Sequence, residues 1–203
     1  MGDRMTAASA YETGLYWRRR ASLIYYKAVS FIVNALQNDV DTIVDVGSGN
    51  TPVLEEFGWA RRRLSIDIRK PYESDGVEAL VCDIMTVRDL PRFDLCLCLQ
   101  VLEHVPDAGA FARRLLELAD VVIVSVPYRW AGRTKGHIHD PVDEDKLRDW
   151  MGRDPVFSLL VEEPRDHTQN RRLISAYDPQ GRSRSLAALG QMRVLHGADG
   201  GSG

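Results

Sequence analysis

The sequence predicts one α/β domain, a mostly parallel sheet with a terminal antiparallel strand pair and helices on both faces. Three observations support this fold class. Five short apolar runs alternate with polar or glycine-rich turns and helix-forming stretches between residues 42 and 128. Several of these runs are apolar on both faces, as expected for buried strands of a parallel sheet. The 203 residues suffice for one well-packed domain but not for two of ordinary size.

The first element expected along the chain is a helix over residues 22–37, which carries apolar side chains at helical spacing. Its expected buried stripe comprises Leu23, Ala28, Phe31, Ile32, Ala35 and Leu36. The parallel strands are expected at Thr42–Val46, Arg63–Ile68, Ala79–Cys82, Asp94–Leu99 and Val121–Val126. The stretch Ala110–Ala119 is rich in helix formers and suits a crossover between parallel strands.

After Tyr128 the pattern changes. A helix is expected over Pro141–Met151, with Asp140 as its N-cap and Pro141 at its first position. Two strands, Val156–Glu162 and Arg172–Tyr177, would form the antiparallel pair. We therefore expect a single domain over residues 1–180, with an N-terminal helical or lid segment over 1–40. Residues 181–203 are expected to form a flexible tail, in which Leu186–Leu195 could form a short helix.

Composition excludes several classes of protein. The net charge is −3 and acidic and basic residues are interspersed, so neither nucleic acid nor an anionic membrane is an expected partner. No apolar segment is long enough to span a bilayer, and the N-terminus lacks the apolar core of a secretory signal. We therefore expect a cytoplasmic protein. Cys82, Cys96 and Cys98 all lie in predicted strands and are interpreted as small buried thiols.

The run 42–51 is an apolar strand that contains Asp45 and opens into the turn Gly47-Ser48-Gly49. Glycine suits such a turn because the backbone bends sharply and a ligand can approach without meeting a Cβ. The third glycine of a dinucleotide fingerprint is absent and Pro52 follows, which makes the turn a poor cradle for a pyrophosphate. Asp67 ends the second strand 22 residues after Asp45, where a carboxylate can bond ribose hydroxyls. A nucleoside without phosphates fits these facts better than NAD.

At this point the sequence resembles the class I S-adenosylmethionine-dependent methyltransferases. VDVGSGNTP is similar to their first motif, which implies that Asp45, Gly47 and Gly49 belong to the cofactor site. LSIDI is similar to their second motif, with Asp67 on the ribose. The resemblance covers residues 42 to about 128 and implies a Rossmann-like methyltransferase sandwich that binds S-adenosylmethionine.

Two further motifs extend the resemblance. VCDIMTV implies that Asp83 bonds the adenine amine and that Ile84 packs on the ring. FDLCLCLQVLEHVPD resembles the signature after the fourth strand, with Gln100 where an acid or small polar residue is common. Structural alternatives remain: Asp83 could cap the following helix, and Glu103 and His104 could be helix-surface groups.

Methyl transfer to a hydroxyl requires removal of a proton, and histidine is the usual base near neutral pH. His137 and His139 lie two residues apart, so they share one face of an extended segment. One of them could act as the general base with the other beside it, or both could be ligands of a divalent metal such as Mg²⁺. His104 follows the fourth strand, close to the expected methyl group, and is the third candidate base. Whether a metal is required stays open, and Asp140 is interpreted as a helix cap rather than as a ligand.

Aromatic and basic residues follow the fifth strand, at Tyr128, Arg129 and Trp130. Aromatic faces pack on sugar C–H surfaces and arginine bonds hydroxyls, so we expect these residues to bind the acceptor. Tyr16 and Trp17 are expected either to form a lid over it or to pack in the core. The acceptor is interpreted as a small molecule, a sugar or glycoside.

The segment Val126–Trp150 resembles the sugar 1-O-methyltransferases of methylmannose polysaccharide synthesis. Alternatives are a natural-product phenol or amine as acceptor, an NAD-dependent oxidoreductase, or a non-catalytic cofactor-binding subunit. The sequence does not decide the acceptor, the position methylated or the oligomeric state, for which a homodimer is one alternative.

Overall fold

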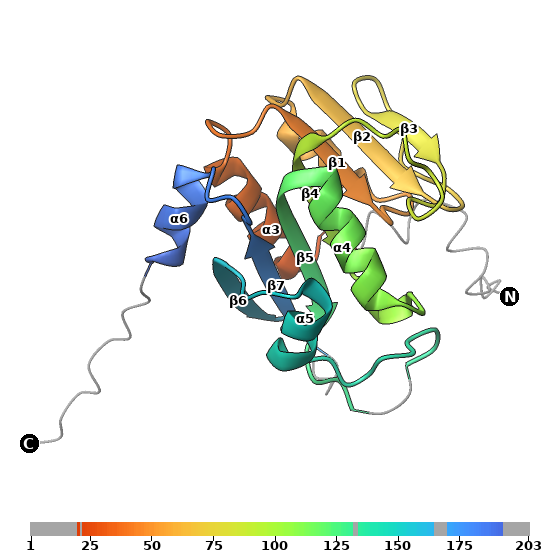
Figure 1. The fold of residues 1–203 in the computed structure, drawn as a ribbon, viewed down its shortest axis with the longest axis vertical. Helices are drawn as coiled ribbons and strands as arrows, with labels where there is room; N and C mark the ends of the chain where they lie inside the picture. The colour runs from red at the N-terminus through yellow and green to blue at the C-terminus, as the bar shows by residue number, and fades with distance from the viewer. Residues whose placement is uncertain (1–19, 21, 132–133, 165–169, 193–203) are drawn as a thin grey trace, which may run out of the picture.

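The computed structural model describes residues 20, 22–131, 134–164 and 170–192 (Figure 1). Within these ranges the chain forms a seven-stranded sheet in the order β3-β2-β1-β4-β5-β7-β6. Strands β1 to β5 run parallel, and β7 is antiparallel to both of its neighbours. The strands are β1 Thr42–Val46, β2 Arg62–Asp67, β3 Glu78–Val81, β4 Phe93–Leu99, β5 Ala119–Pro127, β6 Phe157–Glu162 and β7 Arg171–Tyr177. The predicted α/β sandwich is confirmed, with every strand within two residues of its expected bounds.

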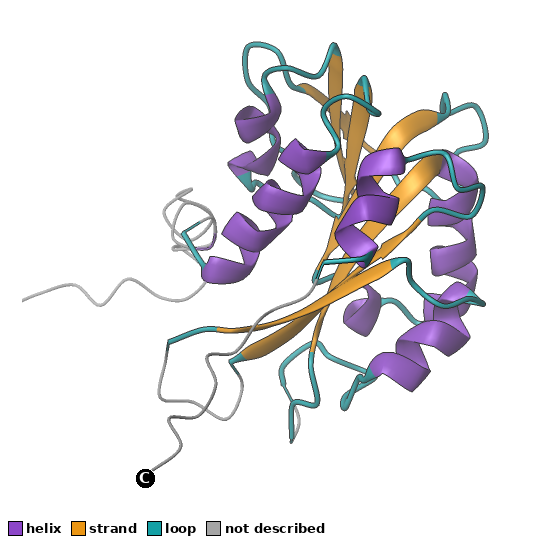
Figure 2. Cartoon of the chain, turned by 90° about the vertical axis from the view of Figure 1, so that its left-hand side faces the viewer, coloured by secondary structure: helices purple, strands orange, loops and turns teal. Residues whose placement is uncertain are grey.

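Helices cover both faces of the sheet, as Figure 2 shows. They are α3 Ile24–Ala35, α4 Ala108–Leu118, α5 Glu144–Met151 and α6 Arg184–Gly190, with short 3₁₀ helices η1 Pro52–Phe57 and η2 Leu102–His104. Because strand side chains alternate between faces, Ile43 packs with α3, η1 and α6, whereas its neighbour Val44 packs with α4 and α5. Among the described residues, none of the helices has the length and apolar character that crossing a membrane requires.

Helix α3 buries most of the predicted stripe: Ile32 and Leu36 lie in the core, and Leu23, Ala28 and Ala35 pack against it. The exception is Phe31, which is 55% exposed, and the fully buried side chains include Tyr25 and Val29. The buried carboxylate of Glu163 accepts hydrogen bonds from the backbone N–H groups of Ile24 and Tyr25, both at 3.0 Å. This contact with the chain after β6 fixes the start of the helix, and the helical repeat then directs Phe31 to solvent. Helical spacing alone could not decide between two overlapping apolar stripes.

Helix α5 begins later than predicted, and its cap is a different acid. Asp143 is the N-cap, and its side chain accepts a hydrogen bond from the backbone N–H of Lys146 at 3.1 Å. The prediction that Asp140 caps this helix is wrong. Asp140 instead accepts a hydrogen bond from His137, so the segment before α5 is drawn toward that histidine.

Helix α6 lies within the segment expected to be a flexible tail. Ser183 caps the helix by accepting the N–H of Leu186, and Leu186 and Leu189 are buried against α3 and the sheet. Residues 184–190 are therefore part of the fold, which corrects that expectation for them. Residues 193–203 lie outside the described residues.

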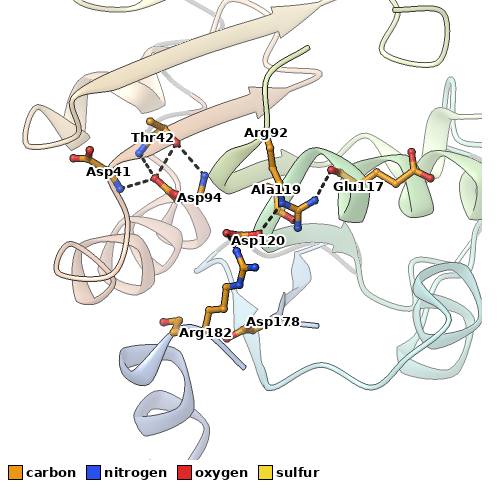
Figure 3. Close-up of polar contacts among 10 residues, drawn as sticks. Asp41, Thr42, Arg92, Asp94, Glu117, Ala119, Asp120, Asp178 and Arg182 are labelled. Atoms are coloured by element: carbon orange, nitrogen blue, oxygen red, sulfur yellow. Dashed lines mark hydrogen bonds and ion pairs between the residues drawn. The ribbon is translucent and has the colours of Figure 1, made fainter. Parts of the chain in front are cut away.

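The amino-terminal ends of three parallel strands are tied together by polar contacts (Figure 3). Asp94 of β4 accepts hydrogen bonds from the backbone N–H and the hydroxyl of Thr42, at 2.8 and 2.9 Å. Asp120 of β5 forms ion pairs with Arg92 and Arg182, at 2.7 and 2.6 Å. These contacts brace the edge of the sheet opposite to the carboxyl ends of the strands.

The cysteines fall into two environments. Cys96 and Cys98 are buried on β4, as predicted, and burial raises the pKa of both thiols well above its ordinary value. Cys82 is only half-buried, because β3 is the edge strand of the sheet. The expectation of three buried thiols is therefore corrected for Cys82.

Candidate active site

The turn after β1 requires glycine at two positions. Gly47 and Gly49 have φ angles of +74° and +53°, which side chains other than hydrogen rarely tolerate. A Cβ at Gly47 would also lie 2.5 Å from Cγ2 of Val101, which follows β4. The two glycines therefore let the chain turn while it lies directly beside the end of the next strand.

An open cavity of about 860 Å³ lies at the carboxyl ends of β1, β2 and β4. Six of the seven predicted cofactor residues line it: Gly47, Gly49, Asp67, Asp83, Ile84 and Gln100. The sheet order reverses between β1 and β4, and α/β sheets commonly bind ligands at such a point. Residues predicted from four separate motifs thus share one cavity.

Asp67 both holds the glycine turn in place and can accept hydrogen bonds from a ligand in this cavity. Its Oδ2 accepts the N–H of Gly49 at 3.0 Å, and its Oδ1 accepts the N–H groups of Arg69 and Lys70 at 2.7 and 3.0 Å. The carboxylate therefore fastens the glycine turn to the end of β2. A carboxylate has about four lone-pair sites, so acceptor capacity remains for ligand hydroxyls.

Gln100 is held in a strained conformation at the end of β4. Its φ is +60°, which is uncommon for a residue other than glycine. Its backbone N–H donates to the carbonyl oxygen of Ser125 at 2.8 Å, and its side-chain amide donates to the Ser125 hydroxyl at 3.2 Å. Bonds to β5 therefore stabilise a bend that brings Gln100 to the cavity wall.

Asp45 is the one predicted cofactor residue that does not line the cavity. Its side chain is 2% exposed, and its Oδ1 has no hydrogen-bond partner among the described residues. Burial, together with the nearby Asp67 carboxylate, raises the pKa of Asp45 to about 8. Asp45 lies beneath the turn rather than at the ligand surface.

Of the three predicted catalytic histidines, His104 lines the cavity, and the ring of His137 packs against the ring of His104. Their ring centroids are 4.8 Å apart and the rings are nearly perpendicular, at 84°. The Nδ1 of His104 lies 2.8 Å from the carbonyl oxygen of Gly136, and the Nδ1 of His137 lies 2.9 Å from Oδ2 of Asp140. Because a carbonyl and a carboxylate only accept, both Nδ1 atoms donate, and in a neutral ring the lone pair is therefore on Nε2. Burial lowers the pKa of His137, against the opposite effect of Asp140.

Glu103 completes this group and was not among the predicted site residues. It is fully buried, so the interpretation of Glu103 as a helix-surface group is wrong. Neither carboxylate oxygen has a hydrogen-bond partner among the described residues, and Oε1 lies 3.9 Å from Nε2 of His104. Burial raises the pKa of this carboxyl to about 8.

His139 takes a different place from the other two histidines. Its Nε2 donates to the carbonyl oxygen of Val105 at 2.7 Å, and its ring packs edge-on against Trp150. Lys146 of α5 donates to the carbonyl oxygens of His139 and Pro141. These contacts attach the segment before α5 to η2, and His139 is not among the residues that line the cavity.

The predicted acceptor-binding residues are only partly brought together. Trp130 is buried, stacks on His137 with centroids 5.5 Å apart, and donates its indole N–H to the carbonyl oxygen of Arg171. Tyr128 and Arg129 instead contact Glu144 at the start of α5. None of these three lines the cavity, and Tyr16 and Trp17 lie outside the described residues.

The chain is similar to known proteins in its three-dimensional structure, but sequence comparison finds no match. No protein-family model matches the chain, and no curated protein matches its sequence. A Burkholderia thailandensis 1,6-didemethyltoxoflavin-N1-methyltransferase, solved with 1,6-didemethyltoxoflavin and S-adenosylhomocysteine, has a TM-score of 0.66 at 20% identity, over 87% of this chain and 92% of that one.

Two further solved structures are similar. The N-methyltransferase NodS of Bradyrhizobium japonicum, with S-adenosylhomocysteine, has a TM-score of 0.61 at 12% identity, over 76% of this chain and 87% of that one. The N-terminal domain of EvdMO1, with S-adenosylhomocysteine and D-fucose, has a TM-score of 0.54 at 15% identity, over 78% and 82%. The chain has the Rossmann-like methyltransferase fold.

Several residues of the site could not be found from sequence motifs. Arg20, Tyr26 and Phe111 line the cavity but come from outside the strand-end motifs. Arg172 lies over the rings of Tyr25 and Trp130, both at 5.1 Å. The only local signal was the apolar periodicity of the helices, which predicts burial and not which residues will face a cavity.

Proposed function

We propose that the protein is an S-adenosylmethionine-dependent methyltransferase that acts on a hydroxyl of a small molecule. The observation that carries this proposal is the convergence of Gly47, Asp67, Asp83 and Ile84 on one cavity, in a chain with the methyltransferase fold. When bound there, S-adenosylmethionine would supply a methyl group activated by its sulfonium charge.

The cavity wall fits the parts of this cofactor. Asp67 keeps lone pairs for ribose hydroxyls, and Ile84 is a buried apolar side chain suited to one face of a purine. Asp83 already accepts the N–H of Met85 through Oδ1, at 2.9 Å, which fixes the turn and leaves Oδ2 for an amino group. The turn at Gly47 and Gly49 presents backbone without side chains. The chain therefore matches a nucleoside better than it matches a pyrophosphate.

The acceptor is proposed to enter beside His104. In the reaction a C–O bond forms as the C–S bond breaks, the hydroxyl proton leaves, and a neutral thioether remains. His104 lines the cavity with Nε2 as its free nitrogen, and His137 and Glu103 lie directly behind it. The two imidazoles can receive a hydroxyl proton, whereas an amine acceptor would need less help. A hydroxyl acceptor is therefore favoured over an amine.

A sugar or glycoside is proposed as the acceptor class, with a methylmannoside methylated at its 1-hydroxyl as the specific prediction. The support is chemical: Arg20, Tyr26 and His104 line the cavity, and arginine, tyrosine and imidazole groups bond polyhydroxylated ligands. A divalent cation is also part of the proposal, and a cytoplasmic location stays a prediction.

The test is methyl transfer from labelled S-adenosylmethionine to mannosides, catechols and amines. Transfer to mannosides supports the full proposal, transfer only to catechols or amines excludes the sugar, and binding of S-adenosylhomocysteine without any transfer excludes the enzyme. Asp67→Asn should weaken cofactor binding. The matched control is Asp75→Asn, because Asp75 is an exposed acid on the loop before β3.

A further inference from the structure

We infer that Glu103, His104 and His137 form a binding site for one divalent transition-metal ion, of the kind that prefers imidazole ligands. One donor atom from each of these residues lies within 4.8 Å of the other two. The inference deepens the proposed function and rests on it for the role of the ion, but not for the existence of the site.

The first argument is the orientation of the two imidazole rings. Metal-binding histidines usually donate their second ring N–H to a carboxylate or a backbone carbonyl, which fixes the tautomer. Both rings do so here: His104 donates Nδ1–H to Gly136, and His137 donates Nδ1–H to Asp140. Two independent hydrogen bonds therefore leave both Nε2 atoms available as lone-pair donors.

The second argument is the Glu103 carboxylate. It is fully buried and neither oxygen has a hydrogen-bond partner among the described residues. The 3.9 Å separation from Nε2 of His104 is too long for a hydrogen bond. A buried carboxylate normally has a partner, because leaving it unpaired is costly. A cation between this carboxylate and the two lone pairs would satisfy all three groups.

The distances agree with a nearly formed metal site. Ligands about 2.1 Å from a tetrahedral ion are about 3.4 Å apart. The three donor atoms lie within 4.8 Å, so each would move inward by about 1 Å or less, which side-chain rotation can supply.

The donor set selects the class of metal. Two imidazoles and one carboxylate suit Zn²⁺, Fe²⁺, Co²⁺ or Ni²⁺, whereas Mg²⁺ prefers oxygen ligands and retains water. The expectation of a magnesium ion is therefore replaced, at this site, by a transition metal. Three protein ligands also leave coordination positions open, as in catalytic metal sites.

The site borders the cavity through His104, so an open position on the ion would be accessible to the acceptor. A metal-bound hydroxyl loses its proton more readily than a free one. Asp140 would act as a positioning residue, because it touches His137 and does not line the cavity.

The experiment is a titration of chelator-treated full-length protein with Co²⁺, followed by visible absorption, with calorimetry of Zn²⁺ and Mg²⁺ in parallel. We expect one equivalent of Co²⁺ to produce ligand-field bands, Zn²⁺ to displace it, and a tenfold excess of Mg²⁺ not to. Wild-type protein that binds no single equivalent of Co²⁺ or Zn²⁺ would overturn the inference. Displacement of Co²⁺ by Mg²⁺ would overturn the choice of metal.

Variants locate the ion. Glu103→Gln and His137→Ala should each weaken binding of Co²⁺ at least tenfold. The matched control His139→Ala removes a histidine two residues away, whose Nε2 is already bonded to Val105, and should bind Co²⁺ as the wild type does. The proposed site would be contradicted if Glu103→Gln and His137→Ala both still bind Co²⁺ as the wild type does. It would also be contradicted if only the control His139→Ala loses Co²⁺ binding.

Binding of S-adenosylhomocysteine, measured on every variant, reports folding separately, because none of the three altered residues belongs to the predicted cofactor set. Should a cluster variant fail to fold, the wild-type titration still decides the inference. Metal binding without methyl transfer to any acceptor would leave the site standing and remove the proposed function.

Discussion

Gly47→Ala tests whether the glycine turn is built as the structure shows. The substitution places a side chain at φ +74° and directs its Cβ to within 2.5 Å of Val101. Two costs therefore add: strain in the left-handed region and overpacking against a half-buried valine.

The magnitude follows from these two costs. Left-handed backbone at a residue with a Cβ costs about 1–2 kcal/mol, and an overpacked contact costs about 1–3 kcal/mol. The free energy of unfolding should fall by about 2–5 kcal/mol, which lowers Tm by about 4–20 °C for a protein of this size. Adding Val101→Ala should remove the contact but not the backbone strain, so the double variant should show a favourable coupling of about 1–3 kcal/mol.

The assay is thermal unfolding of the single and double variants, with binding of S-adenosylhomocysteine measured alongside. Gly58→Ala is the matched control, because a Cβ there meets no atom within 4 Å and the φ of −58° suits alanine. If Gly47→Ala unfolds at the same temperature as Gly58→Ala, the account of the turn is refuted.

Three further substitutions test the buried carboxylates and a cap. Asp45 has a folded-state pKa of about 8, against about 3.9 unfolded, so between these values the unfolded state has lost a proton that the folded state keeps. Wild-type stability relative to Asp45→Asn should therefore fall as pH rises from 4 to 8; a difference in unfolding midpoint that is independent of pH contradicts this. Asp143→Ala should cost about 1 kcal/mol by removing the cap on the N–H of Lys146, while Asp143→Asn should retain the stability; equal losses in both would argue against capping. Glu163→Ala leaves two N–H groups of α3 without their acceptor and should cost about 2–4 kcal/mol in denaturant unfolding, against about 0–1 kcal/mol for the exposed Glu162→Ala; similar losses would exclude the anchoring role.

The strands of the sheet could be predicted because short, local stretches of the sequence define them. The central strands β1, β4 and β5 are buried on both faces and stand between turns, so runs of apolar residues define them. The convergence of Asp67 and Asp83 followed from topology alone, since the ends of parallel strands meet at one edge of the sheet. For the same reason the cavity-lining residues at strand ends were identified without knowledge of any side-chain contact.

The residues near the proposed acceptor could not be predicted in the same way. Contacts between segments far apart in the sequence determine much of their placement. Glu103 is buried by the segment that includes Ile138, whose N–H donates to the carbonyl oxygen of Glu103 at 2.9 Å. The choice between Asp140 and Asp143 as helix cap depended on the position of His137, since both acids have the chemistry of a cap. The burial of Glu103 thus depends on a partner far away in the sequence, whereas the choice of cap depends on His137, three residues before Asp140.

The most direct measurement is calorimetric titration of the purified protein with S-adenosylhomocysteine, repeated with NADH and with Asp67→Asn and Asp83→Asn. The structure predicts one bound S-adenosylhomocysteine per chain, weakened in both variants, and no binding of NADH. Binding of NADH in its place, or S-adenosylhomocysteine binding that neither variant weakens, would show that the cavity does not hold an adenosyl cofactor as described.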